Sequence, residues 1–295
     1  MPEPSITTQT TSDAGTWLTA LDGWMARNPW HPRVTPFLVY IAFLPLISLG
    51  RSWSLTTYPL LYALQTGLVA WLLWRYRRLL PELTLRFHWL AVPVGVGVIA
   101  AWIALGEVMI ALSPSWFGPE GEPHYFEQMQ QQSAGLYWLS LVLRLLGMSL
   151  LVPLFEELFV RSACLRGLHS ARKTGVALVQ LLEDVPLVGE WVMESKLGKR
   201  FADRPAMFTQ QLTQQPLGAL TAFGVTASTL VFMVNHVMRD WPGAIVCGLA
   251  WCALVGWTNR AGKRPMGLGP VVWSHAVANA CLWAWCVWYG DWKWM

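Results

Sequence analysis

The stretch LYWLSLVLRLLGMSLLVPLFEELFV, residues 136–160, is long enough and apolar enough to cross a lipid bilayer. A membrane-spanning helix needs about 20 predominantly apolar residues. Three members of the stretch are ionisable, namely Arg144, Glu156 and Glu157. Ionisable side chains at membrane depth are costly and are functional candidates by default. The stretch therefore predicts a transmembrane helix that carries a functional pair of glutamates.

The composition of the whole chain is that of a membrane protein. Of its 295 residues, 54% are hydrophobic and 13% are charged, whereas soluble domains carry about 25% charged residues. Apolar runs extend nearly end to end, which predicts an all-α polytopic bundle of about seven spans, with six to eight as the range. The expected spans are residues 35–50, 56–74, 90–112, 136–160, 217–238, 243–258 and 271–290.

Outside these spans the chain offers few other features. Residues 1–30 are expected to form a partly disordered cytoplasmic tail that ends in a short amphipathic stretch, and residues 31–295 a single transmembrane domain. Basic and apolar residues alternate through 162–215, which is typical of a segment lying against anionic lipid headgroups; gating of a substrate or binding of a partner is the alternative. The net charge of +4 is modest and dispersed, so nucleic-acid binding is not expected.

The basic residues also predict how the bundle is oriented. The loop at 75–86 holds four arginines, whereas the loop at 113–135 holds three glutamates and neither Lys nor Arg. The positive-inside rule places the first loop in the cytoplasm. The N-terminus is then cytoplasmic and the C-terminus external. Of the 21 Lys and Arg residues, all but four fall on the cytoplasmic side, and these four are Arg51, Arg144, Arg239 and Lys293.

The glutamates belong to a wider set of polar residues in apolar runs. Glu157 and Arg161 are four residues apart, so they share a helix face and can pair. Glu156 points about 100° away and has no local cation. Burial without a fixed partner favours the protonated form of a carboxyl group, which suits a general base acting near neutral pH. Pro153 breaks the helix just before the pair and can open a water-filled cavity there.

Two later spans supply further candidates. His275 and Asn279 are four residues apart and can direct donors toward a developing oxyanion. Phe232 and His236 share a face in the same way, and His236 can orient a water molecule or a glutamate. We therefore predict that the candidate catalytic residues converge on one cavity; they are Glu156, Glu157, His236, His275 and Asn279, supported by Arg161 and Phe232.

Each of these residues also has a structural interpretation. Intramembrane His and Asn side chains commonly hydrogen-bond neighbouring helices, and a Glu–Arg pair can simply stabilise the bundle. No metal or other cofactor is expected, although zinc with Glu156, His236 and His275 as ligands is an alternative. The rival function is a non-catalytic membrane factor or transporter-like protein that uses the same pocket for a ligand or a proton relay.

One more pair of charges lies outside this set. Glu107 is about five residues from the outer end of its span and Arg144 about eight from the outer end of the next, so their depths differ by only about 5 Å. We expect them to form an ion pair between the two spans, with a second polar site or a substrate path as the alternative.

Taken in order, the motifs Glu-Glu-x-x-x-Arg (156–161), Phe-x-x-x-His (232–236) and His-x-x-x-Asn (275–279) resemble those of the CAAX-protease and bacteriocin-processing (CPBP) intramembrane proteases. The resemblance covers residues 136–290, with each motif unsubstituted. The tryptophan-rich C-terminal end and the region 102–117 further resemble the CAAX-protease-related subgroup associated with bacterial exosortase and PEP-CTERM sorting systems.

The resemblance implies a glutamic, formerly metallo-, intramembrane endopeptidase in the bacterial inner membrane. Glu156 then activates water with help from His236, while His275 and Asn279 form the oxyanion site and Glu157 and Arg161 support it. The implied substrate is a membrane-anchored protein or peptide, and exosortase-system proteins are possible partners. The family site opens to the cytoplasm, yet the expected topology places His236 near the outer end of its span. Either this span is short and kinked, or residues 216–224 are partly re-entrant or interfacial.

Overall fold

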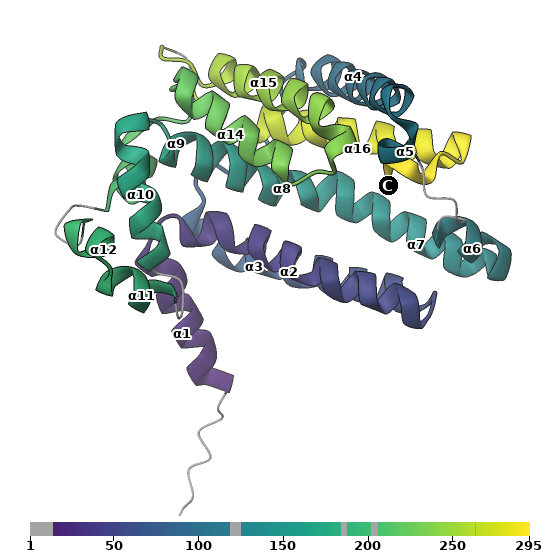
Figure 1. Cartoon of the computed structure of the whole chain (residues 1–295), viewed down its shortest axis with the longest axis horizontal. Coiled ribbons are helices and arrows are strands. Elements are labelled where there is room, and N and C mark those ends of the chain that lie inside the picture. Colours follow the sequence, from purple (N-terminus) through teal and green to yellow (C-terminus); the bar gives the residue numbers. More distant parts are fainter. Residues whose placement is uncertain (1–13, 119–124, 184–187, 202–205, 263) are drawn as a thin grey trace, which may run out of the picture.

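The computed structural model describes residues 14–118, 125–183, 188–201, 206–262 and 264–295 (Figure 1). All regular elements within these ranges are helical, as predicted. Residues 1–13 of the expected tail lie outside them. The remainder of the tail begins with α1 (Ala14–Arg27). The long helices that follow are α2 (His31–Trp53), α3 (Thr57–Tyr76), α4 (Ala91–Leu112), α15 (Trp241–Thr258) and α16 (Gly269–Tyr289).

The stretch that opened the sequence forms one continuous helix of 34 residues, Ala134–Gly167. It extends beyond both ends of the predicted span. Along it the helical form changes, from α7 (Ala134–Leu146) through η2 (Gly147–Leu151), α8 (Val152–Glu157) and η3 (Leu158–Cys164) to α9 (Leu165–Gly167). The segments η2 and η3 are π-helical, so both glutamates lie in α8 between two π segments.

Within the described ranges, five helices are long and apolar enough to cross a membrane: His31–Trp53, Ala91–Leu112, Ala134–Gly167, Met238–Thr258 and Gly269–Tyr289. The other two predicted spans correspond to α3 and to α14 (Ala222–Val234), which has only 13 residues. Large apolar side chains on the outer faces of these helices are exposed, among them Leu49, Leu60 and Leu150. A surface of this kind suits lipid rather than water. The chain is therefore an all-α polytopic membrane protein.

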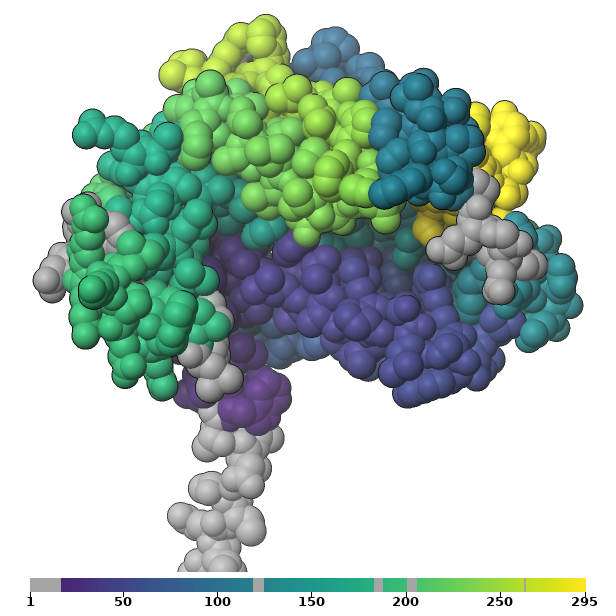
Figure 2. All heavy atoms as spheres, viewed as in Figure 1, coloured from purple at the N-terminus to yellow at the C-terminus, as the bar shows by residue number. Residues whose placement is uncertain are grey.

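The long helix lies between two groups of helices. On one side α2 packs along α3, and both contact the long helix; on the other, α4 packs along α16 and α15, and α14 along α15 (Figure 1). In the space-filling view α2 lies below α14 and α15, and the long helix is largely covered between them (Figure 2). Gly95 lets α4 and α16 approach closely, because a Cβ there would lie 2.4 Å from the Ser274 carbonyl oxygen.

Four short helices gather at one end of the bundle. They are α10 (Ala171–Glu183), α11 (Val188–Glu194), α12 (Lys196–Phe201) and α13 (Met207–Gln214), with α13 packed on α9 (Figure 1). Basic side chains such as Arg172 and Lys199 are exposed here. So are large apolar ones, including Trp191 and Leu197. This mixture is what a segment at the lipid headgroups needs, and the interfacial location stays a prediction.

A buried ionic cluster ties the N-terminal end of α2 to the long helix. Glu82, in the connection between α3 and α4, accepts from Arg33 through both oxygens at 2.5 and 2.8 Å and from Arg166 at 3.0 Å. Ser162 donates to the same carboxylate. Burial raises the pKa of Glu82, but the hydrogen bond of Arg33 and the charges of Arg33 and Arg166 outweigh it and leave the pKa below its usual value. The Glu82 carbonyl also accepts from Leu268, just before α16.

The predicted ion pair between Glu107 and Arg144 is wrong. Glu107 pairs instead with Lys293, whose Nζ lies 2.7 Å from its carboxylate. The C-terminal residues fold back beside α4, where a Cβ on Gly106 would lie 2.4 Å from the Trp294 ring. Similar depth in the membrane did not predict the partner of Glu107, because depth does not specify which helix faces meet. It also does not specify where the C-terminal residues pack against the bundle. Arg144 is left beside tyrosines.

Candidate functional site

The π segments on either side of α8 set the direction of the glutamates. In η2 the Val152 N–H donates to the Gly147 carbonyl, and in η3 the Leu165 N–H donates to that of Val160, five residues back in each case. A π turn holds one extra residue and shifts the side chains that follow around the helix axis. Glu157 is buried in the bundle, while the adjacent Glu156, about 100° around the helix, keeps part of its surface exposed. Such π segments occur frequently at functional sites.

The predicted pair of Glu157 and Arg161 is confirmed. The Nε atom of Arg161 lies 3.3 Å from Oε2 of Glu157, and both side chains have no exposed surface. The other carboxylate oxygen of Glu157, Oε1, lies 2.9 Å from Nδ1 of His275 on α16. A carboxylate paired with an arginine is ionised and accepts only, so Nδ1 of His275 carries the proton and donates it. Glu157 therefore joins the cation of η3 to the imidazole of α16.

The second imidazole nitrogen faces the other glutamate. The Nε2 atom of His275 lies 3.8 Å from Oε2 of Glu156. With the proton on Nδ1, Nε2 of the neutral imidazole is an acceptor. A gap of this size is beyond a good direct hydrogen bond, and two acceptors facing each other call for a donor between them. The site thus has two carboxylates with different surroundings, one fixed and buried and one partly accessible.

Aromatic rings enclose the charged groups. The Arg161 guanidinium lies over Phe232 and Trp251, with distances of 5.0 and 5.5 Å to the ring centroids. The imidazole of His275 stacks on Trp251 at 4.4 Å. The nitrogens of Arg161 make no well-aligned hydrogen bond to any described residue. The charge of Glu157 and the faces of the two rings are therefore its compensation.

The sequence interpretation included Phe232 but missed Trp251. Its indole N–H donates to Ser274 at 3.0 Å, which fixes the ring on which His275 stacks. A tryptophan near the middle of a predicted span, rather than at an interface, was the one available signal, because a buried indole N–H needs a partner.

His236 lies beyond the end of α14, in the turn before α15. The shortness of α14 accounts for this: at about 1.5 Å per residue its 13 residues cover roughly 20 Å, less than a bilayer core. This agrees with the short-span alternative for His236. Its Nδ1–H donates to the Phe232 carbonyl at 2.8 Å, and the ring packs on Phe232 and Trp102. Among the described residues, no hydrogen bond or ion pair joins it to either glutamate.

Contacts join some of the residues that were predicted to share one cavity, and the common cavity stays a prediction. Glu156, Glu157 and His275 are in mutual contact, and Arg161 joins them. Phe232 contacts both imidazoles, with ring centroids 6.4 Å from His275 and 4.7 Å from His236. Phe232 therefore links the two histidines through ring contacts, whereas His236 makes no described contact with either glutamate.

Asn279 supplies a hydrogen bond that the neighbouring helix lacks. Its Nδ2 donates to the carbonyl of Met148 in η2 at 2.6 Å. In the π pattern this carbonyl would accept from residue 153, five positions on, but Pro153 has no N–H. One amide hydrogen of Asn279 therefore bonds to the Met148 carbonyl, and the Nδ1–H of His275 bonds to Glu157. These two residues were predicted to donate to an oxyanion, and each already uses a donor elsewhere.

We expect Asn279→Leu to destabilise the protein by about 1–3 kcal/mol, because the Met148 carbonyl would be left without a donor in an apolar place. In a Pro153→Ala background the restored N–H can satisfy that carbonyl, so the same change should cost less. Thermal unfolding of the four proteins in detergent measures the difference. Equal costs in both backgrounds would contradict the pairing of Pro153 with Asn279.

The histidines and acids do not form a ready metal centre. Within the described part of the chain, no group of three or more His, Cys, Asp and Glu side chains is arranged to hold a metal ion. The alternative ligand set of Glu156, His236 and His275 is therefore not gathered in the described residues.

The fold and the site define a polytopic helical membrane protein with a buried carboxylate–imidazole–carboxylate arrangement at its centre. Comparisons with protein-family models, with curated proteins and with solved structures each find no match for this chain.

Proposed function

We propose that the protein is an intramembrane endopeptidase in which Glu156 activates a water molecule. The observation that carries this proposal is the placement of His275 between the two glutamates, with Nδ1 toward Glu157 at 2.9 Å and Nε2 toward Glu156 at 3.8 Å. Hydrolysis needs a base to take a proton from water and a second group to hold that water. The partly accessible Glu156 and the acceptor Nε2 supply both groups.

In the proposed reaction Glu156 takes one proton from the water while Nε2 of His275 accepts a hydrogen bond from its other hydrogen. The oxygen attacks the carbonyl carbon of a peptide bond, and the protonated Glu156 then gives its proton to the leaving amine. Glu157 holds the imidazole in the required tautomer, in the manner of the acidic member of a catalytic triad. The second amide hydrogen of Asn279 is the donor we assign to the oxyanion. His236, with Nδ1 engaged, presents Nε2 to orient the substrate.

The order of the three motifs supports placing the chain with the CPBP proteases, and we extend the proposal accordingly. The substrate is a membrane-anchored protein or peptide, the compartment is the bacterial inner membrane, and the exosortase-linked sorting systems are the setting to examine first. The buried site supports a substrate that reaches it from the bilayer or its surface.

The test is a comparison of membrane proteins from cells that make the wild-type chain and cells that make Glu156→Ala at equal abundance. The expected result is at least one protein that is shortened only with the wild type. Identical membrane proteomes, with both chains folded, would favour a non-catalytic membrane factor that uses the same pocket for a ligand.

We also propose a cytoplasmic N-terminus and an external C-terminus, because 17 of the Lys and Arg residues fall on one predicted side. A reporter enzyme that is active only outside the cytoplasm should be active when it is fused after Met295. The same reporter fused in the loop at 75–86 is the matched control and should be silent. The reverse result, with both fusions stably made, would overturn the orientation.

A further inference from the structure

Arg144 has no anionic partner among the described residues, because Glu107 pairs with Lys293 instead. The Nε atom of Arg144 is buried and has no hydrogen-bond partner, and its NH1 atom only reaches the Tyr58 hydroxyl at 3.4 Å. The guanidinium lies over the Tyr62 ring at 5.5 Å. No carboxylate among the described residues forms an ion pair with it. A cation in a membrane span without an anion costs several kcal/mol.

Other polar groups beside Arg144 also lack partners. Ser140, one turn earlier on the same face, has a buried hydroxyl without a hydrogen bond. The Tyr62 hydroxyl makes no well-aligned hydrogen bond, and the Tyr40 side chain is a polar neighbour of it. The side chains of Ser140 and Tyr62 are almost completely buried, at 0% and 1% exposure. Buried polar groups are nearly always hydrogen-bonded in folded proteins. Here a guanidinium and two hydroxyls lie close together, and the hydroxyls that can accept from the guanidinium are neutral, so no anion among the described residues balances the charge of Arg144.

A second arginine strengthens the positive character of this region. The exposed Arg51, in the last turn of α2, lies over the Tyr58 ring at 4.8 Å and over Tyr125 at 5.5 Å. The Tyr58 side chain therefore contacts one cation with its face and another with its hydroxyl. Tyr58 therefore lies between the exposed Arg51 and the buried guanidinium of Arg144, so two positive charges are close to this region.

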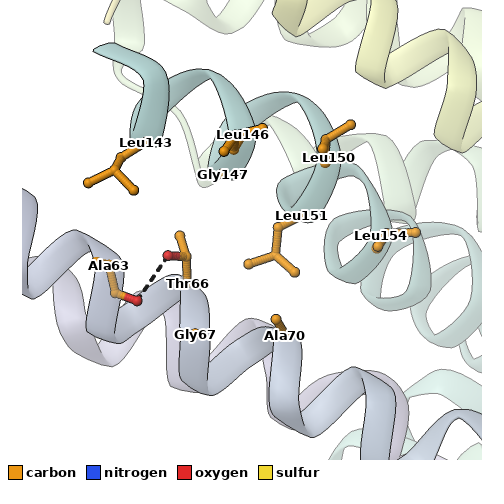
Figure 3. A pocket seen from close by; sticks show the side chains of 10 residues that line it. All are labelled: Ala63, Thr66, Gly67, Ala70, Leu143, Leu146, Gly147, Leu150, Leu151 and Leu154. Atoms are coloured by element: carbon orange, nitrogen blue, oxygen red, sulfur yellow. Dashed lines mark hydrogen bonds between the residues drawn. The ribbon is translucent and has the colours of Figure 1, made fainter. Parts of the chain in front are cut away.

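An apolar groove adjoins the cluster. It has a volume of about 390 Å³ and lies between α3 and the long helix, lined by Ala63, Thr66, Gly67 and Ala70 on one side and by leucines and Gly147 on the other (Figure 3). The Tyr62 hydroxyl lies against Gly147, where a Cβ would be 2.1 Å away. Leu143, next to Arg144 in sequence, and Gly147, three residues after it, are both part of the wall. The exposed Leu146 and Leu150 leave the groove open toward lipid.

We propose that Arg144, Tyr58, Tyr62 and Ser140 bind the anionic group of an amphiphile whose acyl chain occupies this groove. A carboxylate or a phosphate supplies an anionic acceptor and the missing negative charge, and the groove takes the apolar part. Its volume is within the range of ligand sites. The anion can come from a fatty acid or from a phospholipid headgroup. This site is separate from the glutamates and does not depend on proteolysis.

The test uses the full chain, purified and delipidated in a nonionic detergent, with laurate and dilauroyl phosphatidylglycerol as probes and dilauroyl phosphatidylcholine as the zwitterionic control. A ligand that binds only the folded protein raises its unfolding temperature, by roughly 5 °C at about 100 times Kd. We expect such a rise with at least one anionic probe and a much smaller one with phosphatidylcholine.

Two variants remove the two parts of the site. Arg144→Gln should abolish the anion-dependent rise, whereas Arg144→Lys should retain part of it. Gly67→Leu should abolish it by filling the groove, and a side chain fits there because a Cβ on Gly67 would have no neighbour within 4 Å. Arg239→Gln is the matched control, since Arg239 is paired with Asp240 away from the groove.

The pattern of unfolding temperatures across the three probes identifies the anionic group that is bound. A rise with phosphatidylglycerol alone identifies the headgroup phosphate, a rise with laurate alone identifies a carboxylate, and a rise with both shows that the charge suffices. Without ligand, Arg144→Gln should unfold at no lower temperature than the wild type, because it removes an uncompensated charge. Equal rises in wild type, Arg144→Gln and Gly67→Leu, or no rise with either anionic probe, would overturn the proposal. If Arg144→Gln does not fold, Gly67→Leu and Arg144→Lys decide it.

Discussion

Replacing Glu156 by glutamine should lower the rate of proteolysis by about 10²–10⁴-fold, the usual contribution of a general base. The amide keeps the shape of the carboxylate but cannot take a proton from water. Folding should be nearly unaffected, because Glu156 is partly exposed and its side chain lies 3.8 Å from the neutral imidazole of His275 without a direct hydrogen bond.

The measurement is cleavage of a co-expressed substrate, with the membrane level of each variant measured alongside. Glu190→Gln is the matched control, since Glu190 is an exposed glutamate on α11, far from α8 in the chain. Substantial cleavage by Glu156→Gln at normal abundance would remove Glu156 from the role of base. If Glu157→Gln and His236→Ala were active too, the non-catalytic interpretation would be favoured.

Replacing Glu157 by glutamine should destabilise the protein by about 3–5 kcal/mol, the usual cost of removing one partner from a buried ion pair. Arg161 would stay fully buried, with two aromatic faces as its only compensation. Proteolysis should fall as well, because the amide no longer stabilises the Nδ1-protonated imidazole as a carboxylate does.

A double variant separates these two effects. In Glu157→Leu with Arg161→Met both buried charges are absent, and replacing a buried pair by apolar side chains is often neutral for stability. We expect unfolding close to that of the wild type together with little proteolysis. Thermal unfolding and the cleavage assay on the same preparations measure both. A double variant as unstable as Glu157→Gln would show that the pair is not the source of the loss, and full activity would show that Glu157 does not orient His275.

The two adjacent glutamates thus differ through their surroundings alone. Glu157 has a cation and an imidazole donor at 3.3 and 2.9 Å, whereas Glu156 has one imidazole nitrogen at 3.8 Å. Pairs of carboxyl groups whose environments differ in this way commonly take different roles in one reaction. Successive residues of a helix point about 100° apart, so the two side chains face different neighbours although they are adjacent in the chain.

The sequence by itself determined the features that depend on neighbours along the chain. Apolar runs predicted the helical membrane architecture, and a spacing of four predicted the pair of Glu157 and Arg161, because a helix brings such residues onto one face. The identity of the polar residues in those runs was enough to select most of the candidate site. These inferences need only local geometry and the cost of placing charge in hydrocarbon.

The tertiary structure alone decided which distant groups meet. His275 reaches between the glutamates from 118 positions along the chain, Trp251 supports it, and Asn279 serves the carbonyl freed by Pro153. Lys293, near the C-terminal end of the chain, forms the ion pair with Glu107, so Arg144 lies beside tyrosines without a carboxylate partner among the described residues. Such contacts depend on helix rotation, on π segments and on where the chain folds back. Packing of the whole bundle sets all three, and no local period of the sequence encodes them.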